Sequence, residues 1–231
     1  MPAKPVLVFD VNETLLDLDH LRPLFGTLFD DEEVMREWFA QLILYSQVLT
    51  LTKVQSDFRT LAGAVLRMIG TIKGVNITDA QVDQLLKAIG RMPPHADAAE
   101  ALAHLHDQGF HMVTLTNSPP SDGPSALERS GLDKFFRQSF SVQPTGCFKP
   151  APQTYRLVSD ALGRPVSDLC LVACHAWDTI GLQSLGGKGA LVTHGINASL
   201  QGTAAPCPDL VAPTLMEMAH KISVRWAADT P

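Results

Sequence analysis

The sequence predicts an α/β fold: a Rossmann-like, doubly wound parallel sheet as the core, with an α-helical cap inserted after the first strand. Short apolar runs recur along the chain and are separated by helical patterns, an alternation typical of parallel sheets. The helical pattern between residues 19 and 90 is too long for one crossover connection, which indicates an inserted unit. Polar residues follow several of the apolar runs, as expected where parallel strands end at a site.

The first predicted strand, residues 5–9, is a continuous apolar run of the kind that is buried on both faces of a sheet. Apolar residues then recur at helical spacing through residues 38–69. Thr78 precedes the last helical pattern of this stretch as a cap, and Gly90 ends it. We therefore assign residues 19–91 to the cap and residues 1–18 and 92–231 to the core.

The second half of the chain alternates strand and helix patterns. We predict strands at residues 111–116, 139–142, 169–173, 190–193 and 208–211. We predict helices at residues 97–107 and 125–130, around Tyr155, from Asp178 to about 185, and at 216–222. The last residues, 227–231, are expected to be frayed.

Composition limits the classes of function. The 231 residues are 45% hydrophobic and 18% charged, which is typical of a compact globular protein. A net charge of -6 gives no basic footprint for nucleic acid or for an anionic membrane surface. No apolar run is long enough for a membrane helix, and the start has no signal-peptide pattern. We expect a cytoplasmic protein.

The four cysteines, Cys147, Cys170, Cys174 and Cys207, form no CxxC pair. This spacing gives no zinc motif and requires no disulfide framework. We expect reduced thiols, no metal and no cofactor.

Asp10 is the candidate nucleophile. It directly follows the apolar run VLVF and precedes a short polar loop that contains Thr14. Crevices form outside the carboxyl ends of parallel strands, so a buried strand delivers this carboxylate to a site. A covalent intermediate on such a carboxylate divides a difficult reaction into two easier steps.

Other polar residues are expected at the same edge of the sheet. Thr116 and Asn117 follow the second predicted strand, and the segment from His175 to Asp178 follows the fourth. Taken alone, Asn117 fits a turn and Asp178 fits a helix N-cap. Their occurrence at successive strand ends favours one shared site.

The motifs FDVNETLLD, TLTNS and FKP, followed by a strand and an Asp-bearing loop, resemble the haloacid dehalogenase superfamily over essentially the whole chain. Lys149 to Tyr155 and the HAWD segment are more similar to the type II (S)-2-haloacid dehalogenases than to the phosphatases. The resemblance implies hydrolysis of short-chain 2-haloacids, such as chloroacetate and 2-chloropropionate, to 2-hydroxy acids through an ester on Asp10.

Two positions separate this prediction from the alternative, a phosphatase acting on a small phosphate ester. The phosphatases carry a general acid/base two residues after the nucleophile, where this chain has Asn12. They also carry a magnesium-binding carboxylate four residues before Asp178, where this chain has Cys174. Mg²⁺ prefers hard oxygen ligands, so both differences disfavour a phosphatase. A non-catalytic binding protein on the same scaffold is a third alternative.

The resemblance also implies roles for individual residues. Lys149 keeps Asp10 ionised. Asp178 positions or deprotonates the hydrolytic water. Thr14 hydrogen-bonds Asp10. The remaining substrate contacts would come from Val11, Asn12, Thr116, Asn117, Tyr155 and Trp177, together with Phe39 and Tyr45 of the cap.

The chain also departs from the family pattern. Family members carry a halide-binding arginine on the first cap helix, but this segment reads WFAQLILYS, with Phe39 or Gln41 at that place. Arg36 and Arg59 are alternatives. We expect His175 and the Trp177 indole N–H to replace part of that arginine's role. A small aromatic pocket makes fluoroacetate a conceivable substrate.

Family members are often homodimers. The apolar helix at residues 42–51 would serve either as a dimer interface or, as we favour, as a face packed on the core.

Overall fold

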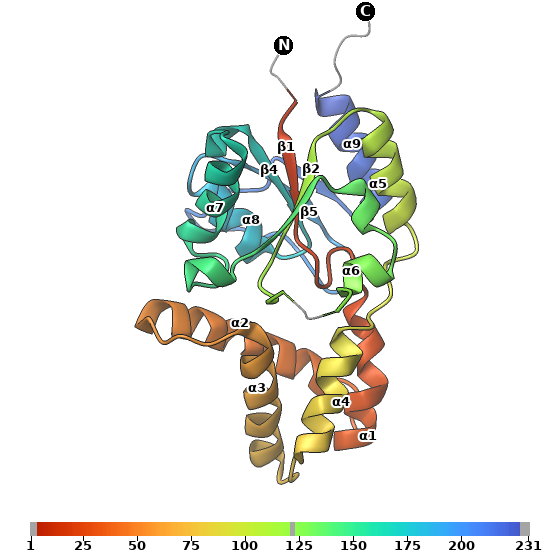
Figure 1. Cartoon of the computed structure of the whole chain (residues 1–231), viewed down its shortest axis with the longest axis vertical. Coiled ribbons are helices and arrows are strands. Elements are labelled where there is room, and N and C mark those ends of the chain that lie inside the picture. Colours follow the sequence, from red (N-terminus) through yellow and green to blue (C-terminus); the bar gives the residue numbers. More distant parts are fainter. Residues whose placement is uncertain (1–3, 121–122, 227–231) are drawn as a thin grey trace, which may run out of the picture.

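The computed structural model describes residues 4–120 and 123–226. Its core is a six-stranded sheet in the order β3-β2-β1-β4-β5-β6, and every pair of neighbouring strands is parallel (Figure 1). The strands are β1 (Val6–Phe9), β2 (Met112–Thr116), β3 (Gln138–Ser141), β4 (Leu169–Ala173), β5 (Lys188–Val192) and β6 (Leu210–Ala212). The predicted α/β fold is confirmed.

The central strands are buried because helices cover both faces of the sheet. Every residue of β1 and β4 is buried, which explains their unbroken apolar sequences. Helices α5 (Ala98–Asp107) and α9 (Leu215–Trp226) lie on one face, and α7 (Pro152–Leu162) and α8 (Ala176–Gln183) on the other (Figure 1). The short helix α6 (Ala126–Arg129) follows the loop after β2.

A helical unit, which we call the cap, lies at the carboxyl ends of the strands (Figure 1). It contains α1 (Arg22–Phe29), α2 (Val34–Thr52), α3 (Phe58–Lys73) and α4 (Asp79–Ile89), preceded by a 3₁₀ turn at Leu18–Leu21. Thr78 caps α4 in a capping box with Gln81, as its sequence indicates. The domain boundaries at residues 18/19 and 91/92 stay a prediction.

Helix α8 begins earlier than predicted. Its first residue is Ala176 and His175 occupies the N-cap position, so Asp178 lies within the first turn and is not the cap. The N-cap interpretation of Asp178 is therefore wrong, and its buried carboxylate needs another explanation.

The sequence left open whether the apolar side chains of α2 pack inside the protein or form a dimer interface. In the structure some of them are buried and others are exposed. Leu42 is buried against the core of the molecule, whereas Leu44 and Leu51 are 49% and 82% exposed. The predicted frayed tail, residues 227–231, lies outside the described residues.

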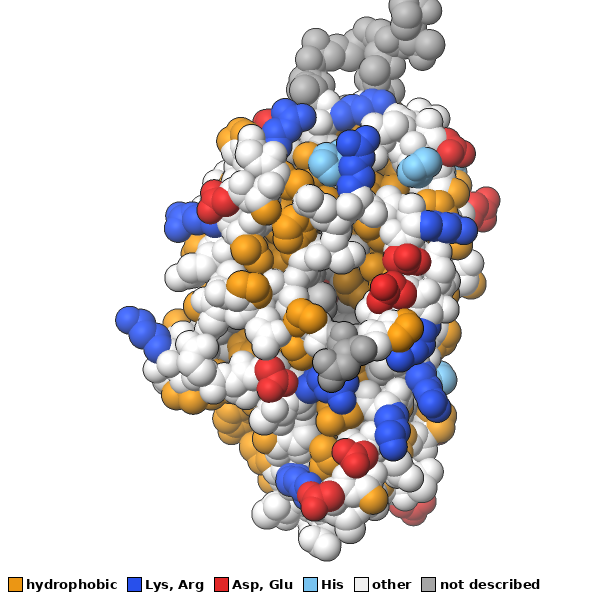
Figure 2. Space-filling model, viewed as in Figure 1, with side chains coloured by type: hydrophobic (Ala, Val, Ile, Leu, Met, Phe, Trp, Pro, Cys, Tyr) orange, Lys and Arg blue, Asp and Glu red, His pale blue; other side chains and the backbone are white. Residues whose placement is uncertain are grey.

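The face in Figure 2 mixes charged, polar and apolar side chains without a large patch of one sign. Among the described residues, no helix is both long and apolar enough to cross a bilayer.

Candidate active site

Asp10 is the first residue after β1, at the carboxyl edge of the sheet. Its backbone N–H donates to the carbonyl of Val172 in β4 (3.0 Å), which fixes the residue between the two central strands. Asp10 is only 5% exposed. Its Oδ1 accepts a hydrogen bond from Lys149 Nζ, and its Oδ2 accepts one from Thr14 Oγ1, both at 2.7 Å. Both contacts were expected from the sequence.

Lys149 lies in the loop that follows β3 and is 1% exposed. Its ammonium group donates to Asp10 Oδ1, to Asp178 Oδ2 (2.7 Å) and to the Leu115 carbonyl (3.0 Å). Its backbone N–H donates to Asn117 Oδ1 at 2.9 Å. All three ammonium hydrogens therefore have partners, and the positive charge is held at one point between two carboxylates.

This pairing keeps both groups charged. Burial alone would raise the pKa of Asp10, but the Lys149 ammonium and the His175 ring hold that pKa well below its usual range. Burial alone would lower the pKa of Lys149, but Asp10 and Asp178 raise it above the usual value. Asp10 is thus an ionised carboxylate throughout the neutral range.

Asp178 lies behind Lys149 as seen from Asp10. It is fully buried, and its Oδ1 accepts a hydrogen bond of 2.6 Å from the Tyr155 hydroxyl. Burial raises the pKa of Asp178 even though Lys149 opposes the shift. Burial and the neighbouring Asp178 also raise the pKa of Tyr155 well above its usual value, so the phenol stays protonated. Tyr155, which the resemblance placed among the substrate contacts, thus donates its hydroxyl to Asp178.

Glu13 is a site residue that sequence reasoning missed. It is 4% exposed, and its backbone φ of 66° is in the left-handed region that a glutamate rarely adopts. Its Oε2 lies 2.7 Å from His175 Nε2, and its Oε1 accepts a hydrogen bond from Arg36. A carboxylate in a polar loop is usually exposed, so nothing in the local sequence indicated that Glu13 is buried. Its two partners, His175 and Arg36, are distant in sequence and could not be inferred from the loop.

His175 lies between two carboxylates. Its Nε2 contacts Glu13, and its Nδ1 lies 3.5 Å from Asp10 Oδ2. Burial would lower the pKa of this ring, but the Cys174 sulfur and the carboxylates of Asp10 and Glu13 hold it well above its usual value. His175 is therefore an imidazolium at neutral pH. The ring thus lies beside the candidate nucleophile, at the same edge of the sheet.

The buried charges of the site balance. Its carboxylates are Asp10, Glu13 and Asp178, and its cations are Lys149, His175 and Arg36. Because these opposite charges touch, the burial of each is compensated by a hydrogen-bonded partner. Arg36 comes from α2, so one of these contacts joins the cap to the loop after Asp10.

Two aromatic rings enclose His175. Trp177 stacks on it with ring centroids 5.0 Å apart, and Phe39 of the cap lies 5.5 Å away on a tilted plane. Lys149 Nζ is 6.0 Å from the Trp177 ring centroid. Tyr45, also predicted to bind substrate, is 36% exposed on α2, and no hydrogen bond or ring contact joins it to the other described residues.

Several polar groups near Asp10 remain available to a ligand. Among the described residues, the N–H groups of Val11 and Asn12 donate to no protein acceptor. The Asn12 side chain donates to Ser118 Oγ (3.1 Å), and the Thr116 hydroxyl accepts from the Ser118 N–H (3.1 Å). The first of these contacts joins the loop after β1 to the loop after β2, which are the two loops expected to bind substrate.

The donor set does not suit Mg²⁺, the metal of the phosphatase branch. Lys149 Nζ bridges Asp10 and Asp178 at 2.7 Å each, and so takes the space that a shared cation would need. Asn12 contacts Ser118, and Cys174 supplies sulfur where an oxygen ligand is required. The oxygens of Asp10 are already engaged by Lys149 and Thr14.

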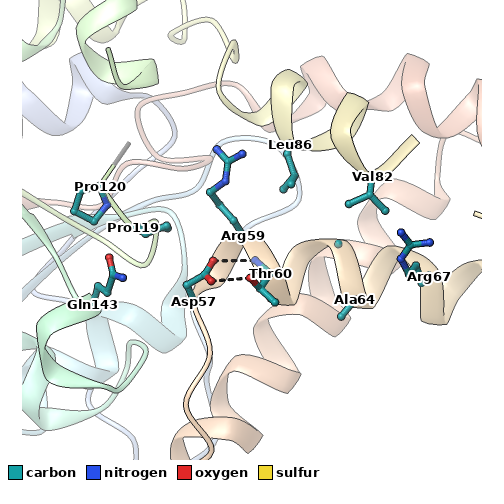
Figure 3. A pocket seen from close by; sticks show the side chains of 11 residues that line it. Asp57, Arg59, Thr60, Ala64, Arg67, Val82, Leu86, Pro119, Pro120 and Gln143 are labelled. Carbon is teal, nitrogen blue, oxygen red and sulfur yellow. Dashed lines mark hydrogen bonds between the residues drawn. The ribbon is translucent and has the colours of Figure 1, made fainter. Parts of the chain in front are cut away.

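A groove with a volume of about 790 Å³ lies where the cap meets the core (Figure 3). Its walls come from α3 and α4 of the cap and from Pro119, Pro120 and Gln143 of the core. In Figure 3 the Arg59 side chain extends between the Pro119 segment and Leu86. Asp10 does not line this groove, but Pro119 follows the Asn117–Ser118 loop directly.

Several known dehalogenases match this chain over most of its length. The family model described as haloacid dehalogenase-like hydrolase matches residues 5–186. The (S)-2-haloacid dehalogenase 4A of Burkholderia cepacia is 26% identical over 223 residues, which cover 95% of this chain and 92% of that protein. The (S)-2-haloacid dehalogenase 1 of Pseudomonas sp. (strain CBS-3) is 29% identical over 188 residues, 79% of each chain.

A solved structure has the same fold. The L-2-haloacid dehalogenase of Xanthobacter autotrophicus, with chloropropionic acid covalently bound, superposes with a TM-score of 0.86. It is 24% identical, and the match covers 98% of this chain and 100% of that one. The resemblance expected from the sequence is confirmed: the chain belongs to the haloacid dehalogenase-like hydrolases.

Proposed function

We propose that this protein hydrolyses the carbon–halide bond of short-chain 2-haloacids and releases 2-hydroxy acids through an ester on Asp10. Chloroacetate and 2-chloropropionate are the first candidates, with fluoroacetate as a third. The single observation that carries the proposal is the ionised, buried Asp10 carboxylate held by Lys149. The names of the curated relatives support the same class of reaction.

In the first step, a carboxylate oxygen of Asp10 attacks the α carbon, and the carbon–halogen bond breaks with its electron pair. The attacking atom needs a full negative charge and little solvent, and Asp10 meets both conditions. Lys149 and Thr14 orient the carboxylate through the hydrogen bonds to its two oxygens. The departing halide carries away the charge that Asp10 loses.

The halide side is formed by Trp177, Phe39 and His175. The Trp177 indole N–H donates to no other described residue, so it is available to the halide. The Nε2 atom of His175 is hydrogen-bonded to Glu13, so its N–H is not available to the halide. His175 therefore acts on the leaving group through the positive charge of its ring. Arg36 is paired with Glu13 and Asp19 (2.7 Å to Asp19), so it does not replace the halide-binding arginine of the family directly.

The substrate carboxylate is bound by the Val11 and Asn12 amides and by the Asn117 side chain. These N–H groups are available among the described residues and lie in the loops after β1 and β2. We propose the groove near Arg59 as the route of access. Arg59 forms no ion pair with another described residue, and a guanidinium there attracts an anionic acid.

In the second step, water attacks the carbonyl carbon of the Asp10 ester, and Asp178 accepts a proton from that water. The acyl carbon–oxygen bond then breaks, and the departing oxygen takes a proton to become the hydroxyl of the 2-hydroxy acid. Asp10 is restored as a carboxylate that carries the oxygen of the water, with one proton released to solvent. Burial raises the pKa of Asp178, which makes it a better base. Once Asp10 is an ester it has lost its charge, and Lys149 stays paired with the Asp178 carboxylate. Tyr155 fixes the far oxygen of Asp178 throughout.

Assembly and location are also proposals. The exposed apolar side chains of α2, such as Leu44 and Leu51, are suited to a homodimer interface. The four cysteines are free, which suits the reducing cytoplasm.

The test is halide release from chloroacetate, 2-chloropropionate and fluoroacetate, measured with EDTA and with added Mg²⁺. We expect release that EDTA does not change and no turnover of p-nitrophenyl phosphate. Asp10→Asn should abolish release while the far-UV circular dichroism spectrum stays that of the wild type. A phosphatase would show the opposite metal dependence, and a binding protein would bind a haloacid without releasing halide.

A further inference from the structure

Glu13 is a buried carboxylate that the proposed reaction steps do not use. Its Oε2 lies 2.7 Å from His175 Nε2, its Oε1 accepts a hydrogen bond from Arg36, and it is only 4% exposed. Its backbone lies in the left-handed region (φ 66°), and His95 Nε2 lies 2.9 Å from its carbonyl oxygen. A glutamate in this conformation carries a backbone cost that its side-chain contacts must offset. Contacts from the cap and from the core therefore fix Glu13 beside the site.

We infer that Glu13 is a positioning residue for the second step: it keeps the His175 ring positively charged while Asp10 is an ester. The ring can then stabilise the negative charge that the attack of water places on the ester carbonyl oxygen. This inference rests on the proposed dehalogenation and extends it to a residue that the reaction scheme leaves out. Glu13 itself touches His175 and not the reacting atoms.

Two carboxylates and one thiol face the His175 ring in the described part of the chain. Asp10 Oδ2 lies 3.5 Å from Nδ1, and Glu13 Oε2 lies 2.7 Å from Nε2. Cys174 Sγ lies 3.6 Å from both ring nitrogens. Burial raises the pKa of the Cys174 thiol, which is therefore neutral at neutral pH. The two aromatic rings that pack on His175 carry no charge, so its own charge depends on Asp10 and Glu13.

Each of these two carboxylates also contacts a second cation. Lys149 donates to Oδ1 of Asp10. Arg36, from α2 of the cap, donates to Oε1 of Glu13. Burial alone would raise the pKa of Glu13, but the His175 ring and the Arg36 guanidinium lower it below its usual value. Glu13 is therefore ionised at neutral pH, and the cap contributes to that charge through Arg36.

The charges around His175 change when Asp10 is alkylated. The ester carries no charge, so within residues 4–120 and 123–226 Glu13 is then the one carboxylate paired with the ring. As water adds to the ester carbon, an electron pair of the carbonyl bond moves onto the carbonyl oxygen, which becomes negative. A cation fixed beside that oxygen in a buried site lowers the barrier to this addition. When the acyl carbon–oxygen bond breaks, Asp10 is a carboxylate again and both anions face His175.

Nuclear magnetic resonance of the free, full-length protein tests the charge of His175 without any substrate. The ring signal of His175 is assigned as the one lost in His175→Gln, and its titration is compared between the wild type and Glu13→Gln. Gln has the length of Glu but no charge, so the titration should move to lower pH by about one to three pH units, the usual effect of a contacting opposite charge. Glu13→Gly also removes the charge and suits the left-handed backbone, so it should give the same change.

Asp19→Asn is the matched control. It removes the other, exposed partner of Arg36 but leaves the contact between Glu13 and His175, so the titration of His175 should stay that of the wild type. An unmoved His175 titration in folded Glu13→Gln or Glu13→Gly would overturn the inference.

Single-turnover measurements with 2-chloropropionate test the effect on the reaction. In Glu13→Gln, hydrolysis of the ester should slow more than its formation, by about tenfold for each pH unit by which the His175 titration falls below the pH of the assay. The rate of hydrolysis should also fall at lower pH than in the wild type, because His175 loses its proton there. Equal slowing of both steps with an unmoved pH profile would make Glu13 a structural residue only.

The two measurements separate this inference from the dehalogenation. A wild type that releases no halide would defeat the proposed function, whatever the titration of His175 shows. Normal halide release together with an unmoved titration in Glu13→Gln would defeat only the role of Glu13.

Discussion

Lys149 Nζ lies 2.7 Å from Asp10 Oδ1, and the two side chains are among the most buried charged groups of the protein. The same ammonium is 2.7 Å from Asp178. One cation therefore sets the charge of the candidate nucleophile and of the candidate base. The predictions below follow from that bridge and from the residues around it.

Replacing Lys149 with Met should slow alkylation of Asp10 by about 10²-fold or more, because a preorganised charge is lost from a dry site. Without the ammonium, burial dominates and the pKa of Asp10 rises. The nucleophile is then protonated at low pH, so the acid limb of the single-turnover rate should move to higher pH. Lys87→Met, at an exposed position of α4, is the control, and an unmoved acid limb in Lys149→Met would speak against the bridge.

The variant Asp178→Asn tests whether Asp178 is the base of the second step or only positions Lys149. If this residue is the base of the second step, the ester on Asp10 should form at nearly the normal rate and then accumulate, with overall turnover lowered by about 10²–10⁴-fold. Rapid mixing followed by mass measurement of the Asp10 peptide detects the ester. Slow alkylation without accumulation would instead make Asp178 a positioning residue for Lys149.

Gly181→Ala should disturb the site through Tyr155, the hydrogen-bond partner of Asp178. A Cβ at position 181 overlaps the Tyr155 hydroxyl, which donates to Asp178. Forcing this overlap costs about 1–3 kcal/mol of stability and displaces Tyr155. We expect a lower melting temperature and a lower kcat. The added Cβ would also lie 2.7 Å from Pro150 Cβ and 2.8 Å from Tyr155 Cε2, so Tyr155→Phe removes one of three overlaps. The double variant should therefore recover part of the stability and none of the kcat, and a double variant no more stable than Gly181→Ala would contradict the overlap with the hydroxyl.

His175→Ala should lower the rate of halide departure about tenfold, because the ring supplies positive charge beside Asp10 and packs on Trp177. Comparison of chloroacetate with bromoacetate checks the cause. The poorer leaving group should be affected more if His175 assists departure. Full turnover in His175→Ala would refute this role.

The sequence predicted the centre of the sheet because β1, β2, β4 and β5 are runs of mostly buried residues, whereas β3 reads as a polar segment and is partly exposed. It predicted Asp10, Thr14, Lys149 and Asp178 because each stands in a motif near a strand end. It missed Glu13, whose burial depends on His175 and on Arg36 of a different unit. Helical spacing could not orient α2 toward the site, so Phe39 and Tyr45 were predicted alike although only Phe39 contacts His175.

The most direct measurement follows oxygen through one turnover. Enzyme in excess over 2-chloropropionate is allowed to react in heavy-oxygen water, and the product and the Asp10 peptide are weighed. We expect the heavy oxygen in the Asp10 carboxylate and an unlabelled oxygen in the new hydroxyl of the product, because Asp10 supplies that atom. Heavy oxygen in the product, with an unlabelled Asp10 after the first turnover, would contradict an ester intermediate on this residue.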